Sequence, residues 1–410
     1  MMISVIQFAF CLCKRNVATD QAGVPALLPY ERGVDWPDLM FGTIPSKITV
    51  CINSIRCDEM AGRGSTHNIE HRFSGPQIDV VDDGWQAVEW EAAFRASQPR
   101  TEVREIQAKS IISHNLSPDV PFGRSINPYQ GCEHGCIYCY ARPSHAYLEL
   151  SPGLDFETRL FAKLNAAALL RREFAKPSYQ PQTIVLGANT DPYQPIEHHY
   201  RLTRELLEVM LAHRHPVGII TKSAMILRDL DLLAELAREG LCQVMVSVTT
   251  LNETLRRQLE PRASTGAGRL KVIEKLAQAG IPVGVLAAPM IPRLNEPELE
   301  QIIKGAVEAG AGCADYILLR LPHELTTLFC DWLEEHYPGQ KEAILNQLRG
   351  SRGGALNSPA FGTRMRGEGQ FADLLAQRFR LISKRLGLGK RHVQLNVERF
   401  LRPNEQLRLF

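Results

Sequence analysis

The residues best suited to chemistry in this sequence are Cys132, Cys136 and Cys139, which form a C-x3-C-x2-C motif. Three thiolates are one ligand fewer than a closed tetrahedral metal site needs. Cysteine thiolates are also the usual ligands of iron–sulfur clusters, and a 4Fe–4S cluster held by three of them keeps one iron free to bind a small molecule. The motif therefore predicts a cluster with an open, reactive iron.

A structural zinc site is the alternative interpretation of the same cysteines. C-x2-C spacing is common in zinc sites, but a fourth Cys or His ligand is then required. His134 and His145 are the nearby histidines, and neither falls into a familiar zinc-finger or zinc-ribbon spacing. No second C-x2-C pair follows in the chain, so the local pattern favours iron–sulfur over zinc.

Downstream of the cysteines, apolar β-rich runs alternate with amphipathic helical stretches, which is typical of a parallel sheet with crossover helices. Six strands are expected, at residues 125–128, 183–186, 217–221, 244–249, 283–287 and 316–319. Two helical faces are expected to be buried, one formed by Phe156, Leu160, Leu164 and Ala167 and one by Leu202, Leu206, Val209 and Met210. Eight units would close a full barrel, so about six indicate an α/β fold with an open, partial (β/α)6 barrel.

Polar residues follow several of these predicted strands, where a parallel barrel places its active site. Thr190 and Asp191 follow the second strand, Lys222 follows the third, and Ser247 lies near the end of the fourth, before Glu-Pro-Arg at 260–262. A Thr-Asp pair after a strand is also a common N-cap for the next helix. Each motif alone is therefore weak evidence, and their common order and placement carry the interpretation.

This order of motifs, together with the aromatic residue before the third cysteine, resembles the radical S-adenosylmethionine (radical SAM) superfamily. Within it, the sequence is similar to the spore photoproduct lyase-like branch, often labelled DNA repair photolyase-like. The resemblance covers roughly residues 60–390 and is strongest from 121 to 292. The run N-P-Y-Q-G-C-E-H-G-C-I-Y-C-Y-A-R-P at 127–143 is most like a bacterial subfamily whose substrate is unassigned.

The resemblance implies that the three cysteines hold a 4Fe–4S cluster, whose free iron chelates the amino and carboxylate groups of S-adenosylmethionine. Electron transfer from the cluster then gives a 5′-deoxyadenosyl radical, with an electron donor such as flavodoxin or ferredoxin. Tyr138 is expected near the adenine, and the other positions expected near S-adenosylmethionine are Thr190, Asp191, Lys222 and Ser247. The substrate that loses hydrogen is expected to be nucleic acid or another macromolecule, with a peptide or small metabolite as the alternative.

Length and composition set the expected organisation of the 410 residues. We expect a poorly patterned N-terminal extension at 1–59, a lead-in segment at 60–120, the barrel at 121–325 and a helical, basic region at 326–410. The family resemblance begins near Met60, which is a candidate start of translation. The apolar stretch 1–10 lacks a basic start and is too short to span a bilayer, so we expect a cytoplasmic protein with no membrane partner.

Charge and the remaining cysteines leave further alternatives open. The net charge is only +2, but residues 349–402 contain 12 Lys plus Arg against 3 Asp plus Glu. This stretch faces either a phosphate backbone or simply solvent. A non-catalytic, metal-stapled nucleic-acid-binding module is therefore a further functional class. The cysteine pairs at positions 11/13 and 51/57 form a candidate second metal site. Three further thiols are expected in the core: Cys242, Cys313 and Cys330. The alternative for these three is that one of them donates hydrogen to a radical.

Overall fold

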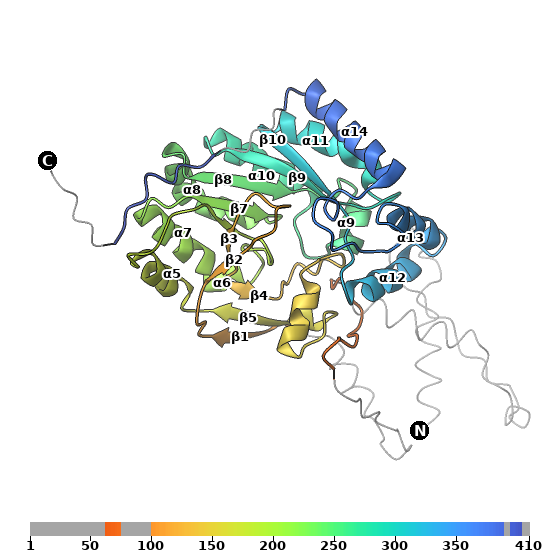
Figure 1. Cartoon of the computed structure of the whole chain (residues 1–410), viewed down its shortest axis with the longest axis horizontal. Helices are drawn as coiled ribbons and strands as arrows, with labels where there is room; N and C mark the ends of the chain where they lie inside the picture. The colour runs from red at the N-terminus through yellow and green to blue at the C-terminus, as the bar shows by residue number, and fades with distance from the viewer. Residues whose placement is uncertain (1–61, 75–99, 389–393, 404–410) are drawn as a thin grey trace, which may run out of the picture. The chain divides into compact units, whose positions relative to one another are not determined.

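The computed structural model describes residues 62–74, 100–388 and 394–403, and its main element is a seven-stranded sheet (Figure 1). Six consecutive parallel strands make up most of it: β3 (Arg124–Ile126), β6 (Ile184–Leu186), β7 (Val217–Thr221), β8 (Cys242–Ser247), β9 (Val283–Met290) and β10 (Cys313–Leu318). A short strand, β2 (Ile112–His114), pairs with β3 in the antiparallel sense. The six predicted strands are confirmed, and their spatial order follows the chain, as in a (β/α) barrel.

Helices connect these strands, and their apolar faces complete the core. The helices and 3-10 turns are η2 (Arg142–Leu148), α4 (Asp155–Thr158), α5 (Ala166–Phe174), α6 (Glu197–Tyr200), α7 (Leu202–Ala212), η3 (Ala224–Asp229), α8 (Leu230–Arg238), α9 (Glu253–Leu259), α10 (Gly266–Gln278), η4 (Glu296–Glu298) and α11 (Leu299–Glu308). The predicted face on α7 is buried at all four positions, Leu202, Leu206, Val209 and Met210. Side-chain caps begin two helices, since Asn252 accepts from the Leu255 amide and Thr265 from the Gly268 amide.

The prediction of one helical face across residues 156–167 is wrong. The structure instead has the short helix α4, then strand β5 (Arg159–Lys163), and only then helix α5. Strand β5 lies between β1 (Glu102–Ile106) and β4 (Tyr129–Gln130) in a second, three-stranded sheet. Leu160 and Ala162 are buried while their neighbours are not, so a period of two and pairing with β1 override the helical spacing.

Beyond the sheet, helices α12 (Leu325–His336), α13 (Lys341–Gly350) and α14 (Gly369–Arg385) form the C-terminal region, with α14 against α11 (Figure 1). Residues 394–403 run along the opposite side, where the Leu401 amide donates to the His213 carbonyl (2.8 Å). In the part of the chain that the structure describes, no helix is long and apolar enough to cross a membrane. The predictions for residues 1–59, for a start at Met60 and for the cysteine pairs 11/13 and 51/57 lie outside the described residues.

Candidate functional site

The cysteine motif lies in the loop of residues 131–141, hereafter the cluster loop, which follows strand β4. Cys132 and Cys136 are buried, and Cys139 is partly exposed. Cys132 and Cys139 pack together against Phe156. The turn between the first two cysteines needs Gly135, whose φ of +67° favours glycine and whose added Cβ would meet the Glu157 carboxylate at 2.6 Å. The conformation of the cluster loop therefore depends on this glycine as well as on the cysteines.

Arg142, directly after the cluster loop, fixes the shape of that loop from behind. Its fully buried guanidinium donates to four backbone carbonyls, including that of Cys136 at 2.8 Å, and pairs with Glu157. Glu157 in turn accepts from the amides of Gly64 (2.9 Å) and Ser65 (2.8 Å). Sequence reasoning missed both residues, although the Arg of A-R-P in the motif was a signal that a charged residue is fixed there.

Lys222, just after strand β7, reaches the cluster loop with its ammonium group. Its Nζ lies 3.2 Å from Cys136 Sγ, 2.9 Å from the Tyr138 hydroxyl and 3.1 Å from Glu260 Oε1. Glu260 is fully buried, is paired with Arg269, and joins the same network. The structure thus brings Cys136 together with two predicted cofactor residues, Tyr138 and Lys222, and with Glu260 of the Glu-Pro-Arg triplet, and it adds the Arg269 guanidinium, which the sequence did not single out.

The charge states of this network follow from the competition between burial and neighbouring charges. Burial alone would lower the pKa of Lys222, but Cys136, Glu260 and Tyr138 raise it well above its ordinary value. Burial would raise the pKa of Glu260, yet Arg269 and Lys222 hold it below its usual range. Burial raises the pKa of Cys136 to about 11, and Lys222 opposes that rise. Lys222 is therefore a cation in position to stabilise a thiolate at Cys136.

Asp191 joins the loops that follow strands β6 and β7. Its Oδ1 accepts from the Thr221 hydroxyl (2.7 Å) and the Tyr193 amide (2.9 Å), and its Oδ2 accepts from the Lys222 amide (2.9 Å). His134 Nδ1 lies 3.5 Å from Oδ2. The N-cap alternative for the Thr-Asp pair is wrong, because the next helix, α6, has its N-cap at residue 196. Asp191 instead fixes the backbone that carries Lys222.

The other two predicted cofactor residues, Thr190 and Ser247, are buried at the same edge of the sheet. Thr190 donates through its hydroxyl to the Tyr129 carbonyl (3.1 Å). Ser247 is the last residue of strand β8, and its carbonyl accepts from Arg269 (3.1 Å). All five predicted cofactor residues therefore lie at the carboxyl ends of the strands or in the cluster loop, and their contact with S-adenosylmethionine stays a prediction.

A segment before helix α10 supports the cluster loop from the side. The Ile137 amide donates to the Leu259 carbonyl (3.0 Å), and the Arg262 amide donates to the His134 carbonyl (3.4 Å). Arg262 also pairs with Glu133 of the loop at 2.7 Å. The Glu-Pro-Arg triplet at 260–262 thus contacts the loop through both its charged side chains, because Glu260 accepts from Tyr138.

The thiols and their surroundings fit an iron–sulfur cluster with one open iron better than they fit zinc. Within the described ranges, no three or more His, Cys, Asp or Glu side chains are placed to hold a single metal ion. A zinc ion would need a fourth ligand beside the three thiols, and His134, one of the zinc candidates, lies with its Nδ1 3.5 Å from Asp191 Oδ2. His145, the other zinc candidate, approaches the Arg159 carbonyl at 2.9 Å instead.

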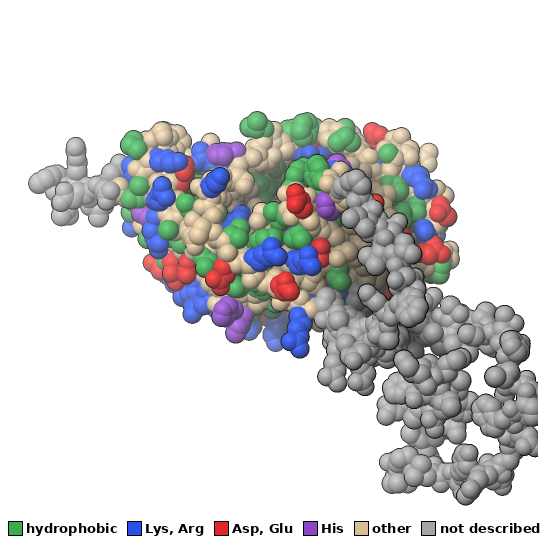
Figure 2. Space-filling model, turned by 90° about the horizontal axis from the view of Figure 1, so that it is seen from below, with side chains coloured by type: hydrophobic (Ala, Val, Ile, Leu, Met, Phe, Trp, Pro, Cys, Tyr) green, Lys and Arg blue, Asp and Glu red, His purple; other side chains and the backbone are tan. Residues whose placement is uncertain are grey.

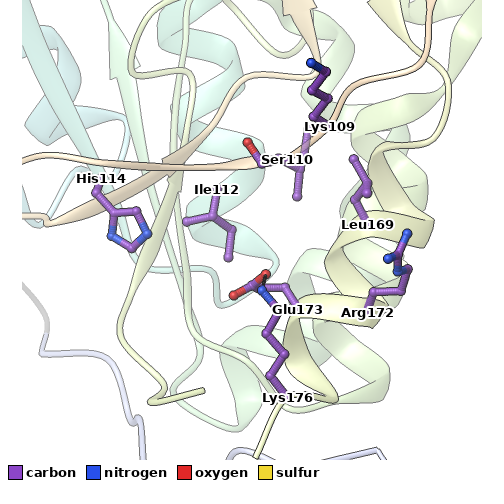
Figure 3. A pocket seen from close by; sticks show the side chains of 9 residues that line it. Lys109, Ser110, Ile112, His114, Leu169, Arg172, Glu173 and Lys176 are labelled. Carbon is purple, nitrogen blue, oxygen red and sulfur yellow. Dashed lines mark hydrogen bonds and ion pairs between the residues drawn. The ribbon is translucent and has the colours of Figure 1, made fainter. Parts of the chain in front are cut away.

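A pocket of about 370 Å³ lies elsewhere, between helix α5 and the segment that leads into strand β2 (Figure 3). Lys109, His114 and Arg172 line it together with Lys176, which is paired with Glu173 at 2.6 Å. None of the predicted site residues lines this pocket. We locate the candidate site at the cluster loop instead, because that is where the thiols and the buried charges meet.

Comparisons with known proteins agree with this geometry. The family model described as "Radical SAM superfamily" matches residues 126–306. An uncharacterized protein of Mycobacterium tuberculosis (strain H37Rv) is 37% identical over 239 residues, which are 57% of this chain and 70% of that protein. An uncharacterized protein of Methanocaldococcus jannaschii is 27% identical over 248 residues, which are 60% of this chain and 88% of that protein. The chain belongs to the radical SAM superfamily and is a radical SAM enzyme.

Solved structures show the same fold. Spore photoproduct lyase complexed with dinucleoside spore photoproduct superposes with a TM-score of 0.51 and 17% identity, covering 69% of this chain and 79% of the lyase. A mutant of that lyase with bound AdoMet and dinucleoside spore photoproduct gives a TM-score of 0.51, with 17% identity, 69% of this chain and 78% of the lyase. The six parallel strands therefore form the partial barrel of a radical SAM enzyme, as predicted.

Proposed function

We propose that this enzyme holds a 4Fe–4S cluster through Cys132, Cys136 and Cys139 and uses S-adenosylmethionine to abstract hydrogen from a nucleic-acid substrate. The observation that carries the proposal is the set of three thiols in one loop, two of them buried, with the Lys222 ammonium 3.2 Å from Cys136 Sγ. When bound, the cluster supplies the electron that cleaves S-adenosylmethionine to a 5′-deoxyadenosyl radical. An electron donor such as flavodoxin or ferredoxin is part of the same proposal.

The residues of the chain have separate tasks in this proposal. Lys222 stabilises thiolate charge at Cys136, and because its three N–H donors already bind Cys136, Tyr138 and Glu260, it acts on the cofactor through its charge. Asp191 holds the Lys222 backbone through a 2.9 Å hydrogen bond. Tyr138 has its hydroxyl fixed by Lys222 at 2.9 Å and Thr249 at 3.0 Å, so its ring is oriented before any cofactor binds. Such preorganisation lowers the cost of binding.

The nucleic-acid part of the proposal rests on two observations. The solved lyase with a similar fold is complexed with a dinucleoside spore photoproduct. The chain also has a basic C-terminal stretch, as a protein that neutralises backbone phosphates requires. On the face shown in Figure 2, however, Lys and Arg side chains stand beside Asp and Glu rather than in a patch of one sign. That mixture favours a peptide or small metabolite as the second candidate substrate.

Iron and sulfide analysis after anaerobic reconstitution tests the cluster assignment. Substitution of any of the three cysteines, Cys132→Ala, Cys136→Ala or Cys139→Ala, is expected to abolish cluster binding, because two thiolates do not hold a cubane that already has an open iron. Cys330→Ala is the matched control, since Cys330 is a partly exposed thiol on α12, and it should retain full iron. Full retention of iron in any of the three loop variants would refute the assignment.

Reductive cleavage tests the activity. Reconstituted protein with dithionite and S-adenosylmethionine should release 5′-deoxyadenosine, and the candidate substrates should be compared as stimulants of that release. If wild-type protein with a full cluster forms no 5′-deoxyadenosine, the proposed reaction is refuted. Stimulation by a peptide or a metabolite but not by nucleic acid would select the second candidate.

A further inference from the structure

Part of the basic C-terminal stretch is neutralised within the fold. Arg364 pairs with Asp119, Arg366 with Asp315, and Arg378 with Glu296 and Glu300. The guanidinium of Arg366 also stacks over the Tyr316 ring at 4.0 Å. These three arginines therefore fasten the C-terminal region to the barrel, and the positive charge predicted for a phosphate backbone is not available at their positions.

Two other arginines, Arg320 just after strand β10 and Arg352 just after helix α13, have no carboxylate partner among the described residues. Arg352 is buried and donates to three backbone carbonyls, those of Leu318, Leu319 and Arg364, at 2.5–3.2 Å. Arg320, two residues beyond the strand, has one hydrogen bond, to Met365 Sδ at 3.5 Å. The Nε of Arg320 is buried and has no hydrogen-bond partner. Arg320 thus keeps most of its donors unused.

The local charge at this place is unbalanced. Arg364 and Arg352 each lie close enough to Arg320 for their charges to interact with it, and Asp119 is the carboxylate that acts on Arg320. Asp119 is already paired with Arg364. Burial, and then the neighbouring Arg364, lower the pKa of Arg320, while burial and then Arg320 lower the pKa of Arg352 to about 10. Guanidinium groups without a counter-charge are costly to desolvate, so an incoming anion is stabilising here.

The unbalanced charge lies at the same edge of the sheet as the cluster loop. Met365, in the loop between helices α13 and α14, accepts from the Leu318 amide (2.9 Å), and that loop lies beside the ends of β9 and β10 (Figure 1). Tyr140 follows the third cysteine, and its exposed ring lies within the electrostatic reach of Arg320. A group bound by Arg320 would therefore be next to the open side of the cluster loop.

We propose that Arg320, supported by Arg352, binds a phosphate group of the substrate at the mouth of the barrel. The inference rests on the proposed function and narrows it to phosphodiester-containing substrates. A guanidinium matches phosphate through two parallel N–H donors, and the unused donors of Arg320 meet that requirement. Arg352 cannot serve as the anchor itself, because its donors are taken up by backbone carbonyls.

Fluorescence anisotropy with the full-length, reconstituted protein tests this site. Labelled single-stranded DNA, double-stranded DNA and RNA are titrated over a series of salt concentrations. Arg320→Gln should bind the preferred oligonucleotide roughly tenfold more weakly, and its salt slope should fall by about one unit, the value for one phosphate contact. Arg320→Lys, which keeps the charge but not the planar fork, should bind with intermediate affinity.

Arg385→Gln is the matched control. Arg385 is exposed at the end of helix α14, in the basic stretch 349–402, and its loss should change affinity by less than twofold. Equal losses in Arg385→Gln and Arg320→Gln would show a diffuse basic surface and overturn the site. Inorganic phosphate and a mononucleotide, added as competitors, show whether the site binds a free phosphate or requires a phosphodiester chain. Stronger competition by an acidic peptide than by oligonucleotides would also overturn the proposal.

The outcome is separable from that of the proposed function. Iron content and thermal unfolding of Arg320→Gln must match the wild type, and Arg320→Lys supplies the comparison if the glutamine variant is unstable. Wild-type protein that cleaves S-adenosylmethionine but binds no oligonucleotide would overturn the phosphate site and leave the radical chemistry intact. Oligonucleotide binding that depends on Arg320 in protein that cannot cleave S-adenosylmethionine would support the site and refute the proposed reaction.

Discussion

Replacing Glu260 by glutamine should destabilise the protein more than any exposed charge reversal in the same region. The Glu260 side chain is fully buried, and it accepts from Lys222 at 3.1 Å and Thr249 at 2.6 Å in addition to its pair with Arg269. Glutamine keeps the shape and one acceptor oxygen. It removes the negative charge, and two buried cations then share a site that has lost their common counter-charge.

The expected loss follows from that imbalance. Removing one partner of a buried ion pair typically costs about 3–5 kcal/mol, and we expect about 3 kcal/mol because glutamine preserves part of the hydrogen bonding. For a domain of this size class, that loss corresponds to a fall in Tm of roughly 6–12 °C. Because the pKa of Glu260 lies below its ordinary value, its carboxylate is fully charged at neutral pH. The difference between variant and wild type should therefore be constant from pH 6 to 8.

Urea unfolding of both proteins, with and without reconstitution, measures the difference. Glu308→Gln is the matched control, since Glu308 on helix α11 pairs with Lys304 at 3.8 Å and both side chains are exposed. Exposed pairs contribute about 0–1 kcal/mol, so this control should be nearly neutral. Equal unfolding free energies for wild type and Glu260→Gln would refute the view that this buried network holds the cluster loop.

Two further predictions concern cofactor binding and pH. Lys222→Ala should retain iron but lose roughly ten- to a hundredfold in affinity for S-adenosylmethionine, the effect of one charge-assisted interaction. Asp191→Ala should also retain iron and weaken binding, because it releases the Lys222 backbone, and unchanged affinity in both variants would remove these residues from the site. His215 is buried against Phe174, and burial lowers its pKa to about 3. On acidification the unfolded chain binds a proton at His215 before the folded protein does. The stabilisation that neutral His215 gives the fold is therefore complete above about pH 6.5 and is lost as pH falls toward 3. His215→Gln should therefore flatten the decrease of unfolding free energy between pH 7 and 5, and an unchanged slope would contradict this.

The parallel sheet was predictable because its signals are local. Each of the six strands is a short apolar run, and strand β7 occupies residues 217–221, as the sequence predicts. The rule that active sites lie at the carboxyl ends of parallel strands then placed Lys222 and Asp191 near the cysteines. No pairing information was needed for that step, since the strands follow one another in space as they do in the chain.

The remaining features depend on partners that are distant in sequence. Strand β5 exists because it pairs with β1, more than fifty residues earlier, and its period-two burial was hidden by apolar residues at helical spacing. Arg378 carries a positive charge in a basic stretch, but its ion pairs with Glu296 and Glu300 decide its role. A charge count over residues 349–402 includes Arg378 and leaves out Arg320, whose lack of a carboxylate partner among the described residues is visible only in the structure.

The Glu-Pro-Arg triplet at 260–262 connects the separate parts of the site. Arg262 holds Glu133 at one end of the cluster loop, and Glu260 holds Tyr138 near the other end. Glu260 also holds Lys222, which stands 3.2 Å from Cys136 Sγ. The cluster loop and the end of strand β7 are therefore fastened to the same carboxylate, so a displacement of the loop also displaces the ammonium that stabilises its thiolate. Such a shared anchor keeps the loop that carries the thiols and Lys222, which is predicted to lie near the cofactor, in one geometry.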